Sequence, residues 1–171
     1  MKEYYDHRLK KTIVSIDAGE TIVSGDDVYL STVLGPCVAA ILWDPVAGIG
    51  GMNHFQSSRP KASEVPVDRA AYYGSVAMPK LLGEMEAAGC RRDRLQAKLF
   101  GGACIYFCDE GSEAGNIGAG NIAYAQTFLE EAGIPVTRQD VGGRRGRRIY
   151  FDVKTFTVYL RKLSEKEYVP Q

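Results

Sequence analysis

The central part of the fold is predicted by the stretch VYLSTVLGPCVAAILWDPVAGIGGMNHF, residues 28–55. It contains three runs with the length and composition of β-strands, at residues 28–34, 38–44 and 49–55. The middle run, VAAILWD, is apolar almost throughout, which is typical of a strand buried on both faces. A Gly-Pro pair and an Asp-Pro pair separate the runs and indicate turns. We therefore expect a meander of three strands, in which Cys37 lies at the first turn.

The remainder of the chain holds further short strands and two helices. We expect strands within residues 12–23, 95–107, 134–140, 147–152 and 156–162. Apolar residues at steps of three and four predict helices over residues 68–88 and 118–132. Because strands and helices do not alternate regularly, the order does not fit a doubly wound sheet. The fold class we expect is α+β, a single-domain layered α/β sandwich in which two amphipathic helices pack on a mixed β-sheet.

The expected domain organisation is simple. A length of 171 residues suits one domain that buries most of its apolar surface. Residues 1–11 are charged and aperiodic, so we expect a loose N-terminal arm there. We expect the domain itself to span residues 12–163, and residues 164–171 to form a C-terminal tail.

The composition argues against several classes of protein. Lys plus Arg and Asp plus Glu both number 21, so the formal net charge is zero and nucleic acid is not the expected partner. The sequence has no run of 18 apolar residues, so membrane insertion is not expected. The N-terminus lacks the apolar core of a signal peptide. We therefore expect a cytoplasmic protein. The four cysteines are expected to be free thiols without a metal or cofactor, because they do not form two close ligand pairs.

Cys37 and His54 are the candidate catalytic pair. A thiol that hydrolyses an amide needs a base, and the only other histidine, His7, lies in the charged arm. If 38–44 and 49–55 pair around their turn, facing residues sum to about 92, which brings His54 within one residue of the position opposite Cys37. The two side chains would then need a bulge to meet. We expect such a pair to lower the pKa of Cys37. The alternative is a small buried cysteine and a hydrogen-bonded histidine without catalytic roles.

A hydroxyl group is the candidate for orienting His54. Ser31 and Thr32 are neighbours and point to opposite faces of their strand, so only one can meet the imidazole. On a regular strand the even separation between Ser31 and Cys37 favours Ser31, and Thr32 remains the alternative. Both hydroxyls could also be ordinary strand residues.

Two glycine-containing segments have weaker signals. The segment FGGA, 100–103, lacks the lysine and hydroxyl of a phosphate loop, so its glycines indicate close approach of another backbone. The segment GGRRGRR, 142–148, holds four arginines. A solvated hairpin turn is its default interpretation, and a docking patch for an acidic protein surface is the alternative.

Three long motifs, in order, make the sequence similar to a known family. They are LSTVLGPCVAAILWDPVAGIGGMNHF (30–55), AMPKLLGEMEAAGCRRDRLQAKLFGGA (77–103) and NIAYAQTFLEEAGIPVTRQDVGGRRGRRIYFD (121–152). Over residues 12–163 the chain resembles the CheD family, the chemoreceptor glutamine deamidases of bacterial chemotaxis. The resemblance implies a Cys-His-Ser/Thr triad in which Cys37 is the nucleophile and His54 the base. It places the orienting hydroxyl six residues before the cysteine, at Ser31, while Pro36 stands where the family usually has serine.

The resemblance also implies an activity and partners. The expected enzyme is a protein-glutamine glutaminase that converts specific receptor glutamines to glutamate and releases ammonia. Hydrolysis of a glutamyl methyl ester at the same site is a further expectation. The expected partners are the cytoplasmic helices of methyl-accepting chemoreceptors and a CheC-type phosphatase. The alternative is a non-enzymatic adaptor that binds such a phosphatase.

Overall fold

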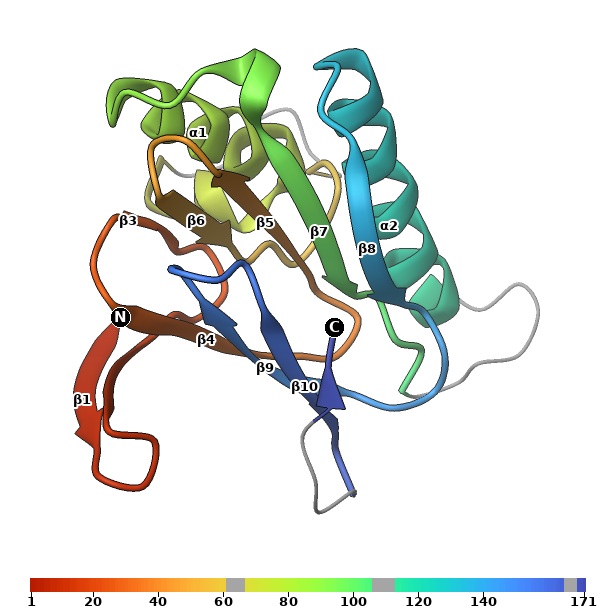
Figure 1. Cartoon of the computed structure of the whole chain (residues 1–171). Coiled ribbons are helices and arrows are strands. Elements are labelled where there is room, and N and C mark those ends of the chain that lie inside the picture. Colours follow the sequence, from red (N-terminus) through yellow and green to blue (C-terminus); the bar gives the residue numbers. More distant parts are fainter. Residues whose placement is uncertain (61–66, 106–112, 165–168) are drawn as a thin grey trace.

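The computed structural model contains two β-sheets and two α-helices, stacked in layers (Figure 1). It describes residues 1–60, 67–105, 113–164 and 169–171, with the backbone alone at 67–69 and 113–116. The helices cover one face of the five-stranded sheet, and the six-stranded sheet packs on its other face. The expected α+β sandwich with two helices on a mixed sheet is therefore confirmed.

The six-stranded sheet has the order β1-β2-β4-β9-β10-β11. Its strands are β1 (Lys2–Asp6), β2 (Lys11–Ser15), β4 (Val28–Leu34), β9 (Arg147–Asp152), β10 (Val158–Lys162) and β11 (Val169–Pro170). Only β2 and β4 pair in parallel; the other neighbours are antiparallel.

The five-stranded sheet has the order β3-β6-β5-β7-β8. Its strands are β3 (Thr21–Ser24), β6 (Ile49–Asn53), β5 (Val38–Asp44), β7 (Gln96–Gly101) and β8 (Val136–Val141). The β7–β8 pair is parallel and the rest are antiparallel. The central strand β5 is covered by helices on one face and by the other sheet on the opposite face, which explains its continuous apolar sequence.

The helices are α1 (Gly74–Ala87), after the 3₁₀ turn Val67–Tyr72, and α2 (Glu113–Glu131). A second 3₁₀ turn, Arg92–Arg94, precedes β7. Gly89 and Gly133 have positive φ just after the helices, which is the conformation that glycine commonly adopts at helix C-termini. Helix α2 begins five residues earlier than the expected 118. The expected strand 95–107 ends at residue 101, and its last two positions lie outside the described residues.

The expected meander of three strands is wrong. β5 and β6 form the predicted hairpin, but β4 belongs to the other sheet, between β2 and β9. The bend at Gly35–Cys37 therefore carries the chain from one sheet to the other. Local patterns did not show this, because pairing of β4 with β9 depends on residues more than a hundred positions away. As a result Cys37 lies at a crossover, at one end of the sandwich.

The chain ends contain strands as well. Lys2–Asp6, within the segment where we expected a loose arm, forms β1 and pairs with β2 along its whole length. Val169–Pro170, within the expected tail, pairs with β10. The domain limits 12–163 stay a prediction.

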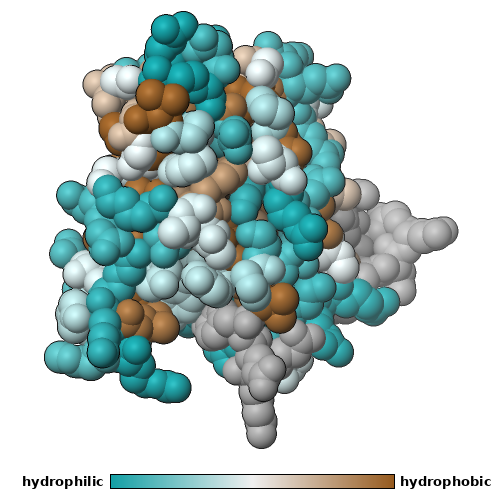
Figure 2. Space-filling view, in the orientation of Figure 1, coloured by the Kyte–Doolittle hydropathy of each residue, from teal (hydrophilic) through white to brown (hydrophobic). Residues whose placement is uncertain are grey.

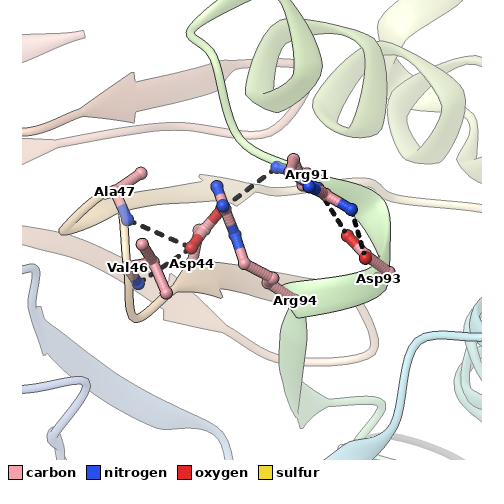
Figure 3. Close-up of polar contacts among 6 residues, drawn as sticks. All are labelled: Asp44, Val46, Ala47, Arg91, Asp93 and Arg94. Atoms are coloured by element: carbon pink, nitrogen blue, oxygen red, sulfur yellow. Dashed lines mark hydrogen bonds and ion pairs between the residues drawn. The ribbon is translucent and has the colours of Figure 1, made fainter.

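The far end of β5 is held by a buried carboxylate (Figure 3). Asp44 accepts hydrogen bonds from the backbone N–H groups of Val46 and Ala47, at 2.9 and 3.1 Å, which closes the β5–β6 turn. It also accepts from the N–H of Arg91 and from the Arg94 guanidinium, whose Nη2 lies 2.7 Å away. Burial alone would raise the pKa of Asp44, but these donors hold it far below its usual range. Asp44 therefore fixes the β5–β6 hairpin to the segment before β7.

The surface in the view of Figure 2 is mostly hydrophilic, with small scattered hydrophobic patches. In the part of the chain that the structure describes, no helix has the length and apolar character needed to cross a membrane.

Candidate active site

The bend that carries Cys37 is held by glycine contacts from the end of β7. The N–H of Gly102 donates to the carbonyl of Cys37 at 2.7 Å, and the N–H of Ala103 donates to the carbonyl of Gly35 at 2.8 Å. Gly101 has φ +113°, and a Cβ there would lie 2.1 Å from the Cys37 carbonyl oxygen. This confirms that the FGGA glycines allow close approach of another backbone, which is that of the candidate nucleophile.

Asn121 of α2 fastens the same bend to the segment after His54. Its Nδ2 donates to the carbonyls of Pro36, at 3.0 Å, and Gln56, at 2.9 Å. Because both partners are acceptors, the orientation of this amide is fixed by its contacts. Asn121 was not among the residues expected from the sequence, since a single asparagine in a helical pattern gives no local signal for such a contact.

Cys37 and His54 lie on the same face of their hairpin. The β5–β6 pairs, and the bridge Val38↔Phe55 beyond them, all sum to 93 rather than the expected 92. His54 is therefore opposite Ala39, and Cys37 is two residues further along the same face. Such diagonal neighbours are about 7–8 Å apart between their backbones, within reach of their side chains. The register thus places the two on one face without the expected bulge.

That face points into the space between the two sheets. Ala39 and Met52, which share the parity of Cys37 and His54, belong to the core between the sheets, and Cys37 packs against this core. His54 is 6% exposed, whereas Cys37 is only partly buried. The imidazole is therefore enclosed and the thiol is closer to solvent.

Thr32 holds the imidazole of His54. Thr32 Oγ1 lies 2.8 Å from His54 Nδ1 and 2.8 Å from the carbonyl oxygen of Ile16. A hydroxyl has one hydrogen, and the carbonyl can only accept, so Thr32 donates to Ile16 and accepts from Nδ1–H. This assigns the proton of neutral His54 to Nδ1 and leaves a lone pair on Nε2.

The hydroxyl at Thr32, not that at Ser31, contacts the histidine. Leu30 and Leu34, which share the parity of Thr32, lie in the core between the sheets. Ser31 is on the opposite face of β4, although it too is buried. The even separation of Ser31 and Cys37 was misleading because β4 ends at Leu34 and the bend then leads into another sheet. Thr32, the alternative to Ser31, is therefore the residue in hydrogen-bond contact with His54.

Burial keeps both members of the pair neutral. Burial lowers the pKa of His54 to about 4, and the nearby Asp17 and Glu20 carboxylates oppose this only in part. Burial also raises the pKa of the Cys37 thiol, against a smaller lowering by its own backbone N–H. The expected lowering of the Cys37 pKa is therefore wrong for this state. Among the described residues, His54 Nε2 is buried without a hydrogen-bond partner, so no bond to Cys37 is formed.

The other cysteines are placed differently. Cys90 is a buried free thiol on the helix side of the five-stranded sheet. Cys104 is disulfide-bonded, so the expectation of four free thiols is wrong for it. Cys108 lies outside the described residues. Within the described ranges, no three His, Cys, Asp or Glu side chains are grouped so that they could hold a metal ion.

The arginine-rich segment is not a simple solvated turn. Arg147 is 1% exposed and lies 2.7 Å from the Asp140 carboxylate. It also donates to the carbonyls of Gly101, at 3.1 Å, and Gly142. Arg144, by contrast, is exposed. One arginine of the cluster is thus structural, and it supports the same glycine that touches Cys37.

Comparison with known proteins finds one family and several relatives that carry its name. The family described as "CheD chemotactic sensory transduction" matches residues 57–162. A protein of Bordetella avium (strain 197N) named "Probable chemoreceptor glutamine deamidase CheD" is 40% identical over 164 residues, which cover 95% of this chain and 71% of that protein. A CheD 1 protein of Anaeromyxobacter dehalogenans (strain 2CP-C), with the same description, is 42% identical over 88% of this chain and 84% of its own. A CheD 2 protein of Shewanella oneidensis is 40% identical over 93% and 80%.

Proposed function

The chain belongs to the CheD family, and from this premise we propose that it is a cysteine hydrolase that converts specific chemoreceptor glutamines into glutamates. The reaction would release ammonia from the side-chain carboxamide. The names of its relatives, which are called probable chemoreceptor glutamine deamidases, support this substrate class. The nucleophile in the proposal is Cys37, the base is His54 and the orienting residue is Thr32.

One observation carries the proposal: the hydrogen-bond chain from Ile16 through Thr32 to His54. It leaves Nε2 of a buried imidazole unprotonated and without a partner among the described residues. A buried acceptor without a donor is unfavourable and rare in folded proteins, and a role in a reaction is one explanation for it. The thiol on the same face of the hairpin is a donor that can satisfy it once Cys37 turns towards the imidazole.

The first step forms a bond between Cys37 Sγ and the carboxamide carbon. His54 Nε2 takes the thiol proton as the bond forms, so the resting pair does not need to be ionised. The electron pair of the C=O bond moves to the oxygen. Thr32 accepts from Nδ1–H of the resulting imidazolium and holds its ring in place.

Backbone N–H groups are the candidates for stabilising the oxyanion. The N–H of Cys37 lies near its own sulfur, where it already lowers the thiol pKa. Pro36 has no N–H and cannot contribute. Asn121 and Gly102 hold the carbonyls on either side of this N–H, which keeps its direction fixed during the reaction.

The remaining steps return the enzyme to its starting state. The oxyanion collapses, the C–N bond breaks, and the proton on Nε2 goes to the departing nitrogen, which leaves as ammonia. Water then attacks the thioester while His54 accepts a proton from it. The C–S bond breaks, Cys37 recovers a proton, and glutamate remains. A glutamyl methyl ester could follow the same steps with methanol as the leaving group.

We place the reaction on the cytoplasmic helices of methyl-accepting chemoreceptors. A CheC-type phosphatase as regulator is part of the same proposal and rests on the family resemblance. The competing function is an adaptor that binds such a phosphatase without turnover. The adaptor differs from the hydrolase in that it would have no use for an unpartnered imidazole.

Ammonia release from a receptor fragment separates the two functions. The wild-type protein should release ammonia, Cys37→Ala should not, and Cys90→Ala is the matched control for loss of a buried thiol. Binding of the fragment by all three proteins, with ammonia from none, would favour the adaptor. Equal release by Cys37→Ala and the wild type would exclude Cys37 as nucleophile.

A further inference from the structure

The feature beside the active site that the reaction does not use is a pocket with strong positive charge. Its lining residues are Gly142, Gly143, Arg144, Arg145, Arg147 and Lys162, and its volume is about 270 Å³. We call it the basic pocket. We infer that it binds a carboxylate side chain of the substrate and thereby selects glutamines that have a glutamate nearby on the same helix. The inference rests on the proposed function and adds a rule for which glutamines are chosen.

The charge of the basic pocket favours an anion. Arg144, Arg145, Arg147 and Lys162 bring four positive charges into its wall. The carboxylate of Asp140 offsets one of these charges, because it lies 2.7 Å from Arg147 Nη1 and 3.5 Å from Lys162 Nζ. This concentration stands out in a chain whose formal net charge is zero. The volume accommodates a carboxylate together with several waters, each of which takes about 30 Å³.

The basic pocket is fastened to the two strand ends that flank Cys37. On one side the N–H of Gly142 donates to the carbonyl of Gly101 at 2.9 Å, next to the Gly102 that holds the Cys37 carbonyl. On the other side a Cβ at Gly146 would lie 3.0 Å from the carbonyl oxygen of Leu34, at the end of β4. β8 is separated from β5 by β7 alone, so the end of β8, where the pocket begins, lies two strand spacings, about 10 Å, from the start of β5 next to Cys37.

This separation matches the repeat of a helical substrate. Residues four and seven positions apart on one face of an α-helix are separated by about 6 and 10.5 Å along its axis. A carboxylate one or two turns from the target glutamine therefore reaches the basic pocket when the carboxamide meets Cys37. The bound carboxylate would align the helix, which is the use of remote binding energy that favours reaction at one position.

The ligand of the basic pocket is also the product of the proposed reaction. Each deamidation turns a neutral glutamine into a glutamate, and that glutamate can occupy the pocket when a neighbouring glutamine is presented. The first deamidation on a helix therefore promotes the next, one or two turns away. This makes an acidic side chain on the substrate helix the expected occupant.

The test compares receptor fragments that differ at one position. Each fragment has one target glutamine and, about one or two helical turns away, either glutamate, glutamine or lysine. For the wild-type protein we expect KM for ammonia release to be about fivefold lower with glutamate than with glutamine, and higher still with lysine. The difference should disappear at about 0.5 M salt, where exposed charges are screened.

A charge reversal makes the test specific. Arg144→Glu should invert the order, so that the lysine fragment has the lowest KM. The matched control is Lys10→Glu, which changes the net charge equally at the exposed tip of the β1–β2 hairpin, away from the β8–β9 connection (Figure 1). It should keep the wild-type order. Inversion by Lys10→Glu as well would show a general charge effect and overturn the inference.

Failure of the inference can be told apart from failure of the proposed function. Equal KM values for the three fragments, with ammonia still released, would overturn the inference and leave the deamidase intact. If no fragment releases ammonia, the proposed function fails, and the same fragments are then compared by fluorescence anisotropy for binding to the wild-type protein. Equal affinities for the glutamate and lysine fragments would overturn the inference there too.

Discussion

At the scale of single residues, His54 should make stability depend on pH. Its pKa is lowered by burial to about 4 in the folded protein from the ordinary value of 6.5. As pH falls through this window the unfolded chain takes up a proton first, so stability is full above pH 6.5 and is lost towards pH 4. We expect a loss on the order of 3 kcal/mol in the free energy of unfolding. Urea titrations of the wild type and His54→Gln at several pH values in this range measure the loss. If the unfolding free energy depended on pH equally in the two proteins, the buried neutral imidazole would be contradicted.

The orienting hydroxyl gives a second prediction at this scale. Thr32→Ala removes the acceptor of Nδ1–H, so kcat for ammonia release should fall about 100-fold or more. Ser31→Ala removes a hydroxyl on the other face of β4 and should change kcat by about threefold at most. Thr32→Ser keeps the hydroxyl and should restore most of the rate. A larger effect at Ser31 than at Thr32 would return the role to Ser31.

Sequence patterns supplied the candidate residues of this site. His54 was the candidate base because His7 lies in the charged arm, and Cys37 was the candidate nucleophile from its turn and the family resemblance. The orienting hydroxyl was left between Ser31 and Thr32. Sequence patterns could not choose between these two, because the bend after β4 changes sheets and alternation along a strand does not continue across it. Nor could they show that burial, rather than an ion pair, sets the two pKa values.

At the scale of elements, the bend before β5 depends on the absence of a side chain in β7. Gly101→Ala would place a Cβ 2.1 Å from the Cys37 carbonyl and force φ +113° on a residue with a side chain. We expect a loss of about 2 kcal/mol or more in unfolding free energy, together with a fall in kcat. The matched control is Gly83→Ala in α1, where nothing lies within 4 Å. It should stabilise the protein by about 0.5–1 kcal/mol. Wild-type turnover in Gly101→Ala would show that the contact does not position Cys37.

The other end of β5 gives a purely structural prediction. Asp44→Asn removes the charge that Arg94 and the backbone N–H groups of the turn surround (Figure 3). Breaking such a buried pair should cost about 3 kcal/mol in the free energy of unfolding. Because the pKa of Asp44 is lowered in the folded state, its contribution is present above the ordinary value of 3.8 and is lost as pH falls below it. Denaturation at neutral pH measures the loss, and a change under 1 kcal/mol would contradict it.

Sequence patterns predicted the helices and strands better than they predicted which strands pair with one another. The apolar run of β5 and the steps in α1 and α2 were visible locally. The division of the strands between two sheets was not, since the β2–β4 and β4–β9 pairs join segments without a shared local signal. The structural role of Arg147 was hidden for the same reason, because its partners Gly101 and Asp140 come from other strands.

At the scale of the whole molecule, the elements around the candidate site meet at one crossover. The two sheets, the end of β7 and α2 all meet at the bend that contains Cys37, and the basic pocket lies beside it. An amide hydrolase uses this arrangement to bring a protein helix to a thiol at the edge of a sandwich. An adaptor would use the surface without the thiol.

The most direct test of the central claim is to trap the nucleophile. A receptor fragment would carry a chloromethyl ketone analogue of glutamine at the target position, and the modified protein would be digested and mapped by mass spectrometry. The account predicts one fragment per protein, attached at Cys37, with slower attachment in Thr32→Ala. Attachment at Cys90, or none while the natural fragment still releases ammonia, would contradict it.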